Sequence, residues 1–232
     1  MIWTRPAEKR GHADYGWLST SHTFSFNTYY DPDHMGFRSL RVINEDLVMP
    51  GQGFGMHPHR DMEIVTYVTS GELEHRDSLG NGGILRGGEL QRITAGTGIL
   101  HSEFNPSSEE PVHLYQIWLL PDRRGLSPSY EQRALGTTLA PTGLRLAVSP
   151  DGREGSLAIH QDAKLFLGSL EPGGVLDYQI ERERHAWLQV VSGTMHLGDH
   201  MLNTSDGAAI SEEHSIRIKA LEPVHFMLFD LA

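Results

Sequence analysis

The sequence predicts an all-β fold, built as an antiparallel barrel or jelly roll. Short runs of aromatic and β-branched residues are separated by frequent turn residues, including 25 glycines and 12 prolines among 232 residues. Apolar residues seldom recur at the helical period of 3.6 residues. The chain is long enough for one large β domain or two smaller ones, because domains usually contain about 100 to 150 residues.

Strand candidates follow one another through the first half of the chain. The run 63–69 ends at Ser70-Gly71 and the alternating run 72–77 follows, so we expect these two strands to pair as a β-hairpin. Turns are expected at residues 50–53 and 78–83. The other strands of this half are expected at residues 40–48, 90–94 and 113–120.

The middle of the chain contains the expected domain boundary. Residues 121–128 have the composition of a loop, and we expect a short helix to begin within residues 129–135. Residues 136–143 would then link the two halves. We therefore expect one domain over residues 1–135 and a second over residues 136–232, where short strands and glycine turns continue.

Two short segments of the first half recur in the second half at the same separation. Met49-Pro50-Gly51 matches Glu171-Pro172-Gly173, and Val68-Thr69-Ser70-Gly71 matches Val190-Val191-Ser192-Gly193, each 122 residues later. Two matches at one separation indicate that the domain is duplicated.

Charge and residue content narrow the classes of function. The 19 basic and 30 acidic residues give a net charge of −11, which repels phosphate backbones and argues against nucleic-acid binding. We expect a neutral, aromatic or cationic substrate instead. The chain has no cysteine, which excludes disulfides, zinc fingers and iron–sulfur clusters, so a metal would be held by nitrogen and oxygen ligands.

The sequence also bears on the compartment. No run of about 18 apolar residues predicts a membrane span. Residues 1–6 lack the apolar stretch of a signal peptide. We therefore expect a cytoplasmic protein with no membrane partner.

Two short clusters of histidine and carboxylate residues predict a metal site. Residues i and i+2 of a strand face the same side, so His57 and His59 can both point into a barrel while Pro58 faces outward. His101 and Glu103 have the same spacing and can come from a second strand. Three neutral imidazoles and one carboxylate leave a divalent ion with a net charge of about +1 and open coordination positions. This arrangement is typical of a catalytic site.

The carboxylate ligand can be assigned in two ways. Glu63 lies four residues after His59 and would face the same side of a continuous strand, so it competes with Glu103 for this role. We favour Glu103, and Glu63 would otherwise hydrogen-bond to a histidine ligand. The remaining histidines weighed as ligands are expected to be exposed or hydrogen-bonded instead: His75, His113, His160, His185, His196, His200, His214 and His225.

These clusters resemble the two sequence motifs of the cupins. Residues of the first motif are Gly51, His57, His59, Glu63 and Gly71, and the run 96–101 with Asn105 resembles the second. More narrowly, the runs 57–63 (HPHRDME) and 94–103 (TAGTGILHSE) are similar to the pirins, and the similarity extends over residues 25–30 and 46–120. The resemblance implies a bicupin of two tandem jelly-roll barrels, in which the N-terminal barrel holds one metal through His57, His59, His101 and Glu103.

The pirin resemblance also implies chemistry. The expected metal is iron(II), with copper, manganese, nickel, cobalt or zinc as alternatives. Bacterial pirins imply a quercetin 2,3-dioxygenase activity, in which dioxygen opens the central ring of a flavonol and carbon monoxide is released. Glu103 is then the expected base for the flavonol 3-hydroxyl proton. The alternatives are a non-catalytic, redox-responsive regulator that binds a protein partner, and an isomerase or storage cupin without oxygen chemistry.

Apolar residues near the ligands are candidates for the wall of a substrate cavity. They are Phe26, Phe54, Met56, Ile99 and Phe104.

The second half carries a poorer set of ligands. The separation of 122 residues puts Gln179 and Glu181 at the positions of the first histidine pair. If Gly207 is aligned with Gly96, Glu212 and His214 take the positions of the second pair. We therefore expect the C-terminal barrel to lack a metal and to support the first barrel.

Overall fold

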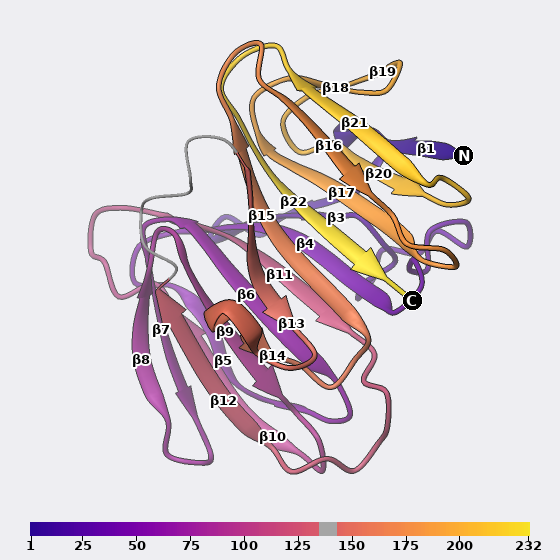
Figure 1. Cartoon of the computed structure of the whole chain (residues 1–232). Helices are drawn as coiled ribbons and strands as arrows, with labels where there is room; N and C mark the ends of the chain where they lie inside the picture. The colour runs from indigo at the N-terminus through magenta and orange to yellow at the C-terminus, as the bar shows by residue number, and fades with distance from the viewer. Residues whose placement is uncertain (135–142) are drawn as a thin grey trace. The chain divides into compact units, whose positions relative to one another are not determined.

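The structure is a computed structural model that describes residues 1–134 and 143–232, and nearly all of its regular secondary structure is antiparallel strand (Figure 1). Among these residues the helices are two short 3-10 turns, Ala7–Lys9 and Arg153–Gly155. The strands form two units with two sheets each, which confirms the predicted bicupin architecture. In this described part of the chain, no helix has the length and apolar character needed to cross a membrane.

Neither unit is one continuous stretch of the sequence. Among the described residues, the N-terminal unit contains residues 11–134 and 157–161, and the C-terminal unit contains residues 1–10, 143–156 and 162–232. Residues 1–10 belong to the C-terminal unit because β1 (Ile2–Arg5) pairs with β20 (Gly207–Ile210). The predicted first domain, residues 1–135, differs from the N-terminal unit in these residues. The expected linker at 136–143 and the boundary after residue 135 fall almost wholly outside the described residues.

The N-terminal unit is a jelly roll of a larger and a smaller sheet. The larger sheet has the strand order β12 (Ser129–Ala134), β9 (Glu89–Thr94), β6 (Glu63–Ser70), β11 (Val112–Leu119), β4 (Leu40–Val48), β3 (Leu18–His22) and β2 (Gly11–Asp14). The smaller sheet has the order β5 (Gly53–His59), β10 (Ile99–Phe104), β7 (Glu72–Asp77) and β8 (Gly82–Arg86). Alternate apolar residues from both sheets, such as Val68 and Leu73, are fully buried in a shared core.

The C-terminal unit repeats this plan. Its larger sheet contains β1, β20, β17 (His185–Ser192), β22 (Val224–Leu231), β15 (Ala163–Leu170) and β13 (Gly143–Ser149) in that order. Its smaller sheet has the order β16 (Val175–Gln179), β21 (Ser215–Ala220), β18 (Met195–Leu197) and β19 (His200–Leu202).

The predicted duplication is visible in matching strands and turns. β6 and β17 are both eight residues long and start 122 residues apart, at Glu63 and His185. Gly71 and Gly193, which end the matched segments, have φ of +79° and +88°. A Cβ at Gly71 would collide with the carbonyl of Pro111, just before β11, and a Cβ at Gly193 with the carbonyl of Pro223, just before β22. Glycine is therefore required at both turns for the same reason.

Two predictions for the first half are wrong. The strand predicted at residues 72–77 exists as β7, but it pairs with β8 and β10 instead of β6. Both edges of β6 are already paired, with β9 and β11, so no edge remains for a hairpin partner. The segment expected to begin a helix is β12, all six residues of which pair with β9. Tertiary pairing here overrides the helical preference of residues such as Glu131 and Gln132.

Candidate metal centre

Two adjacent strands of the smaller sheet bring the predicted ligands together. His57 and His59 alternate with Pro58 on β5, and His101 lies on β10 as the direct Cα partner of His57. β5 is the edge strand of its sheet, where a proline without an N–H group is tolerated. Gly53 permits the close pairing, because a Cβ there would overlap the backbone of β10 at Glu103.

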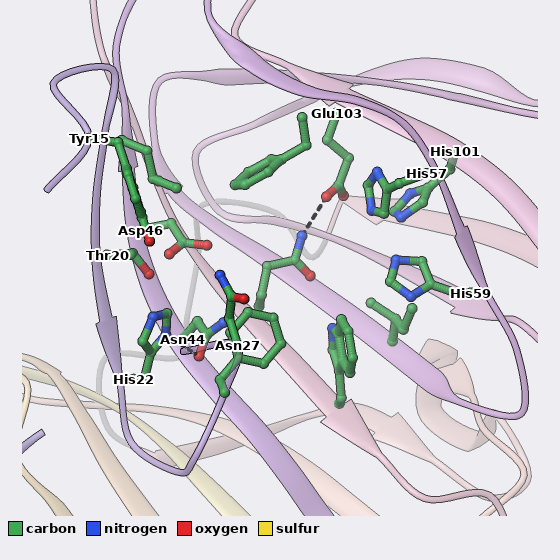
Figure 2. Close-up of a pocket in the computed structure, with 16 residues that line it drawn as sticks. Tyr15, Thr20, His22, Asn27, Asn44, Asp46, His57, His59, His101 and Glu103 are labelled. Carbon is green, nitrogen blue, oxygen red and sulfur yellow. Dashed lines mark hydrogen bonds between the residues drawn. The ribbon is translucent and has the colours of Figure 1, made fainter. Parts of the chain in front are cut away.

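The three histidine rings form a tight cluster. Their centroids are 4.8 Å apart for His57 and His59, 4.4 Å for His57 and His101, and 4.8 Å for His59 and His101. One ring nitrogen of each lies within 4.8 Å of the others. Figure 2 shows the three rings at one side of a cavity in the N-terminal unit.

His59 and His101 are held in the neutral form that can bind a metal. Burial, with His57 nearby, lowers the pKa of His59 to about 4 and that of His101 to about 2. His57 Nδ1 donates to the carbonyl of Gly55 at 2.7 Å, which leaves its Nε2 with a free lone pair. Both ring nitrogens of His101 are buried without a hydrogen-bond partner. Neutral imidazoles with buried, unpaired nitrogens fit a divalent transition metal.

Glu103 lies beside this cluster and is held by three side chains of the larger sheet. Gln91 Nε2 donates to Oε1 at 2.5 Å and Gln116 Nε2 donates to Oε2 at 2.6 Å. The Thr66 hydroxyl donates to Oε1 at 3.3 Å. Burial raises the pKa of Glu103 to about 7. Each carboxylate oxygen has two lone pairs, so Oε2, which accepts from Gln116 alone, keeps capacity for a further partner.

The structure divides the candidate ligands into two groups that share His101. One group is His57, His59 and His101, and the other is His75, His101 and Glu103. His75 lies opposite Glu103 on β7, is fully buried, and has no hydrogen-bond partner at Nδ1. Its Nε2 lies 3.2 Å from Asp77 Oδ2, as expected for a hydrogen-bonded histidine.

Sequence analysis did not place His75 beside the ligands, although a signal was present. His75 and Asp77 have the i, i+2 spacing on a strand whose Leu73 is buried in the core. The incorrect pairing with β6 concealed this, because only the pairing with β10 brings His75 opposite Glu103.

The alternative carboxylate, Glu63, has other partners. Its Oε2 accepts from the Thr94 hydroxyl at 2.9 Å, and its Oε1 lies 3.3 Å from His160 Nδ1. Among the described residues it belongs to neither group of candidate metal ligands. The assignment of Glu63 as a metal ligand is therefore not supported by the geometry, and neither is its expected bond to a ligand histidine.

The cavity beside the histidines has aromatic walls. Of the five predicted wall residues, Phe26 and Phe54 line it. Met56 and Phe104 are 58% and 38% exposed, and Ile99 packs in a separate core cluster. Trp118, which was not among the predicted wall residues, also lines the cavity, and its ring meets His59 edge-to-face at 5.0 Å and Phe26 at 5.4 Å.

The register of the C-terminal unit corrects the alignment proposed for its ligand positions. Gln179, the counterpart of His57, is the Cα partner of Ser215 on β21. Ser215, and not Glu212, therefore occupies the position that His101 has opposite His57. The alignment of Gly207 with Gly96 was wrong, because Gly207 is the Cα partner of Gln189 on β17, as Leu90 is of Tyr67 on β6, so Gly207 corresponds to Leu90. The expectation that this unit lacks a metal stays a prediction.

Comparisons with known proteins agree with this architecture. The chain matches the family described as Pirin over residues 4–119 and the Quercetinase C-terminal cupin domain over residues 146–231. It is 51% identical over 231 residues to the quercetin 2,3-dioxygenase of Escherichia coli (strain K12), covering 100% of this chain and 99% of that protein. It is 39% identical over 238 residues to a pirin-like protein of Caulobacter vibrioides (strain ATCC 19089 / CIP 103742 / CB 15), covering 100% of both.

A solved structure extends the similarity to three dimensions. The crystal structure of the bacterial pirin YhhW from Escherichia coli in complex with nickel(II) has a TM-score of 0.95 and 51% identity, and the match covers 100% of this chain and 99% of that chain. Full-length similarity in sequence and in fold leads to one conclusion. This chain belongs to the pirin family.

Proposed function

We propose that this protein is a metal-dependent quercetin 2,3-dioxygenase, which opens the central ring of a flavonol with dioxygen and releases carbon monoxide. The observation that carries the proposal is a cluster of three histidines beside a buried carboxylate, facing a cavity with aromatic walls. A flat polyphenol suits such a cavity, because aromatic side chains pack against its rings. A relative that is 51% identical to this chain is named quercetin 2,3-dioxygenase, which supports the same activity.

We infer that His57, His59, His101 and Glu103 hold one divalent metal ion, iron(II) in our assignment. The nickel(II) in the related pirin structure supports a divalent first-row metal. Nitrogen and oxygen donors bind several such metals, so copper, manganese, nickel, cobalt and zinc are the alternatives that metal analysis has to distinguish. When bound, the ion supplies Lewis acidity toward the flavonol oxygens and redox chemistry toward dioxygen.

The chain's own contribution is proton transfer, orientation and exclusion of water. Glu103 is the proposed base for the 3-hydroxyl proton, and its buried position favours taking up a proton. The amide groups of Gln91 and Gln116 hold its two oxygens in place. Trp118 and Phe26 form an apolar wall against which the flavonol rings pack and from which water is excluded.

The test is an aerobic assay of metal-loaded protein with quercetin. We expect dioxygen uptake, carbon monoxide release and loss of the flavonol absorbance in equal amounts. His59→Ala should lose both the metal and the activity, whereas His12→Ala, which changes an exposed histidine of the same unit, should retain both. Metal-loaded wild-type protein that leaves quercetin unchanged would rule out the proposed reaction.

One observation favours the regulatory alternative. Met56, Leu100 and Phe104 directly neighbour the candidate ligands in sequence, and their side chains are 58%, 45% and 38% exposed. Exposed apolar residues of this kind suit a protein partner. Under this alternative, oxidised and reduced metal-loaded protein would differ in affinity for that partner and neither form would consume quercetin.

A further inference from the structure

A row of polar side chains crosses the inner face of the larger sheet. Its five members lie on five adjacent strands, and each is the Cα partner of the next one across the sheet. We call this set the polar row: Gln91, Thr66, Gln116, Asn44 and His22. Its first three residues hold Glu103. Its last two residues, which the mechanism does not use, are joined by a 2.9 Å hydrogen bond between His22 Nδ1 and Asn44 Oδ1.

A second pair of buried polar residues lies next to this unused end. Asp46 follows Asn44 by two residues on β4, and its Cα partner on β3 is Thr20. The i, i+2 spacing places Asp46 on the same face as Asn44, and Thr20 on the same face as His22. All four side chains line the cavity and are between 3% and 6% exposed. We call Thr20, His22, Asn44 and Asp46 the distal wall.

The distal wall faces the histidine cluster across the cavity. Figure 2 shows the carboxylate of Asp46 directed into the cavity, with His57, His59 and His101 at the other side. Aromatic contacts span the distance between them: His59 meets Trp118, Trp118 meets Phe26, and Phe26 lies 5.2 Å from His22. The cavity therefore has a polar group at each end, and the rings of Trp118 and Phe26 line one part of the wall between them.

Asp46 is the residue of the distal wall that most requires a ligand. Thr20 hydrogen-bonds to its carboxylate, but Oδ1 is buried without any hydrogen-bond partner. A buried carboxylate oxygen without a donor is costly, and native proteins rarely retain one without a reason. A hydrogen-bond donor that enters the cavity would satisfy this oxygen.

We propose that the distal wall binds a phenolic hydroxyl group on the substrate ring that is remote from the reacting carbons, with Asp46 Oδ1 as the acceptor. The proposal rests on the flavonol dioxygenase function above and assigns the residues that select hydroxylated substrates. A neutral O–H group fits, because its hydrogen bond to a carboxylate is charge-assisted. A phosphate, sulfate or carboxylate group does not fit, because Asp46 would repel it. Burial raises the pKa of Asp46 to about 6, so the carboxylate is mostly ionised at neutral pH and accepts the bond.

Two flavonols distinguish this role from the chemistry at the metal. Quercetin and 3-hydroxyflavone share the reacting 3-hydroxyl group, but only quercetin carries hydroxyl groups on its outer rings. We would measure both dissociation constants without oxygen, by fluorescence quenching of metal-loaded protein, so that binding is observed without turnover. The variants are Asp46→Asn, which keeps the shape and removes the charge, and Asp33→Asn, which changes an exposed aspartate of the same unit.

We expect wild-type protein and Asp33→Asn to bind quercetin at least tenfold more tightly than 3-hydroxyflavone. In Asp46→Asn this preference should fall about tenfold, with an unchanged metal content. A preference that is the same in Asp46→Asn and wild type would overturn the proposal. If Asp46→Asn does not fold, equal affinities of wild type for the two flavonols would overturn it instead.

The two proposals fail in different ways. If wild-type protein consumes neither flavonol in air but shows the Asp46-dependent preference, the dioxygenase function is wrong and the distal wall still binds phenolic ligands. If it consumes both flavonols without such a preference, the dioxygenase function stands and the distal wall does not select the substrate.

Discussion

His57 and His101 are direct Cα partners on two adjacent antiparallel strands, and their ring centroids lie 4.4 Å apart. The i, i+2 spacing on each strand then adds His59 to one side of this pair and turns Glu103 toward the interior. A single strand pairing therefore joins two sequence clusters more than forty residues apart.

Glu103 and Glu63 are both buried glutamates, but only Glu103 lies with candidate ligand histidines among the described residues. Glu103→Gln removes a negative charge beside the metal and should lower metal affinity about 10- to 100-fold. Glu63→Gln removes a charge that faces Thr94 and His160, so its metal affinity should stay within about twofold of wild type. Competitive titration with a metal indicator measures both. Equal losses in the two variants would contradict the assignment of Glu103.

Gln116 donates its amide N–H to Glu103 and accepts from Thr66. Gln116→Leu should leave Glu103 Oε2 without this donor and lower metal affinity or kcat about tenfold. Gln52→Leu changes an exposed glutamine near β5 and should alter neither quantity. Steady-state kinetics and metal content, measured on the same preparations, check the result. A wild-type kcat and metal content in Gln116→Leu would show that the glutamine does not position Glu103.

Asp46 predicts an unusual dependence of stability on pH. Burial raises its pKa from 3.8 to about 6, so the folded protein binds more protons than the unfolded chain between these values. As the pH rises from about 3.8 to 6, Asp46 ionises in the unfolded chain before it ionises in the folded protein. Its titration therefore lowers the free energy of unfolding over this range, by at most about 3 kcal/mol, and has no such effect below pH 3.8. Asp46→Asn cannot ionise and should become more stable relative to wild type over this range.

Urea unfolding of metal-free protein at several pH values between 4 and 7 measures this difference. Groups that do not interact with Asp46 cancel in the comparison, and Glu103, whose pKa the Asp46 charge raises, changes the difference in the same direction. A difference in the free energy of unfolding that stays constant with pH would show that the Asp46 carboxyl is not destabilised by burial. Combined with the ligand measurements, a more stable but less selective Asp46→Asn would show that this residue serves binding at the expense of stability.

Gly96 tests the loop that precedes β10. It has φ of +47°, and a Cβ there would overlap the carbonyl of Leu126. Gly96→Ala should lower the free energy of unfolding by about 2 kcal/mol or more. Gly55→Ala is the matched control, because a Cβ at that position meets nothing within 4 Å, and its effect should remain within about 0.5 kcal/mol. Urea unfolding of both variants gives the comparison, and similar stabilities would contradict the predicted collision.

Local pattern predicted much of this protein. Alternation and turn residues identified β4, β6, β7, β9 and β11 within about a residue at either end. The i, i+2 spacing identified the three clustered histidines, and the repeated segments identified two related barrels. These features depend on neighbours in the sequence, which the sequence shows directly.

Pairing across the fold was decided by tertiary structure. Segment 129–134 has helix-forming residues but becomes a strand, because the free edge of β9 is available to it. β7 does not form the expected hairpin with β6, because both edges of β6 are already paired. β7 pairs with β10 instead, and this pairing brings His75 beside Glu103. Residues 2–5 near the start of the chain pair with a strand some two hundred residues later.

The sequence by itself therefore determined many of the strands, the duplication and the side to which His57, His59 and His101 point, because the two-residue period of a strand is a local property. Only the tertiary structure decided which side chains meet. The polar row needs the register of five strands, and the unpartnered oxygen of Asp46 needs the burial that both sheets produce. Register and burial depend on contacts between distant segments, so local pattern does not contain them.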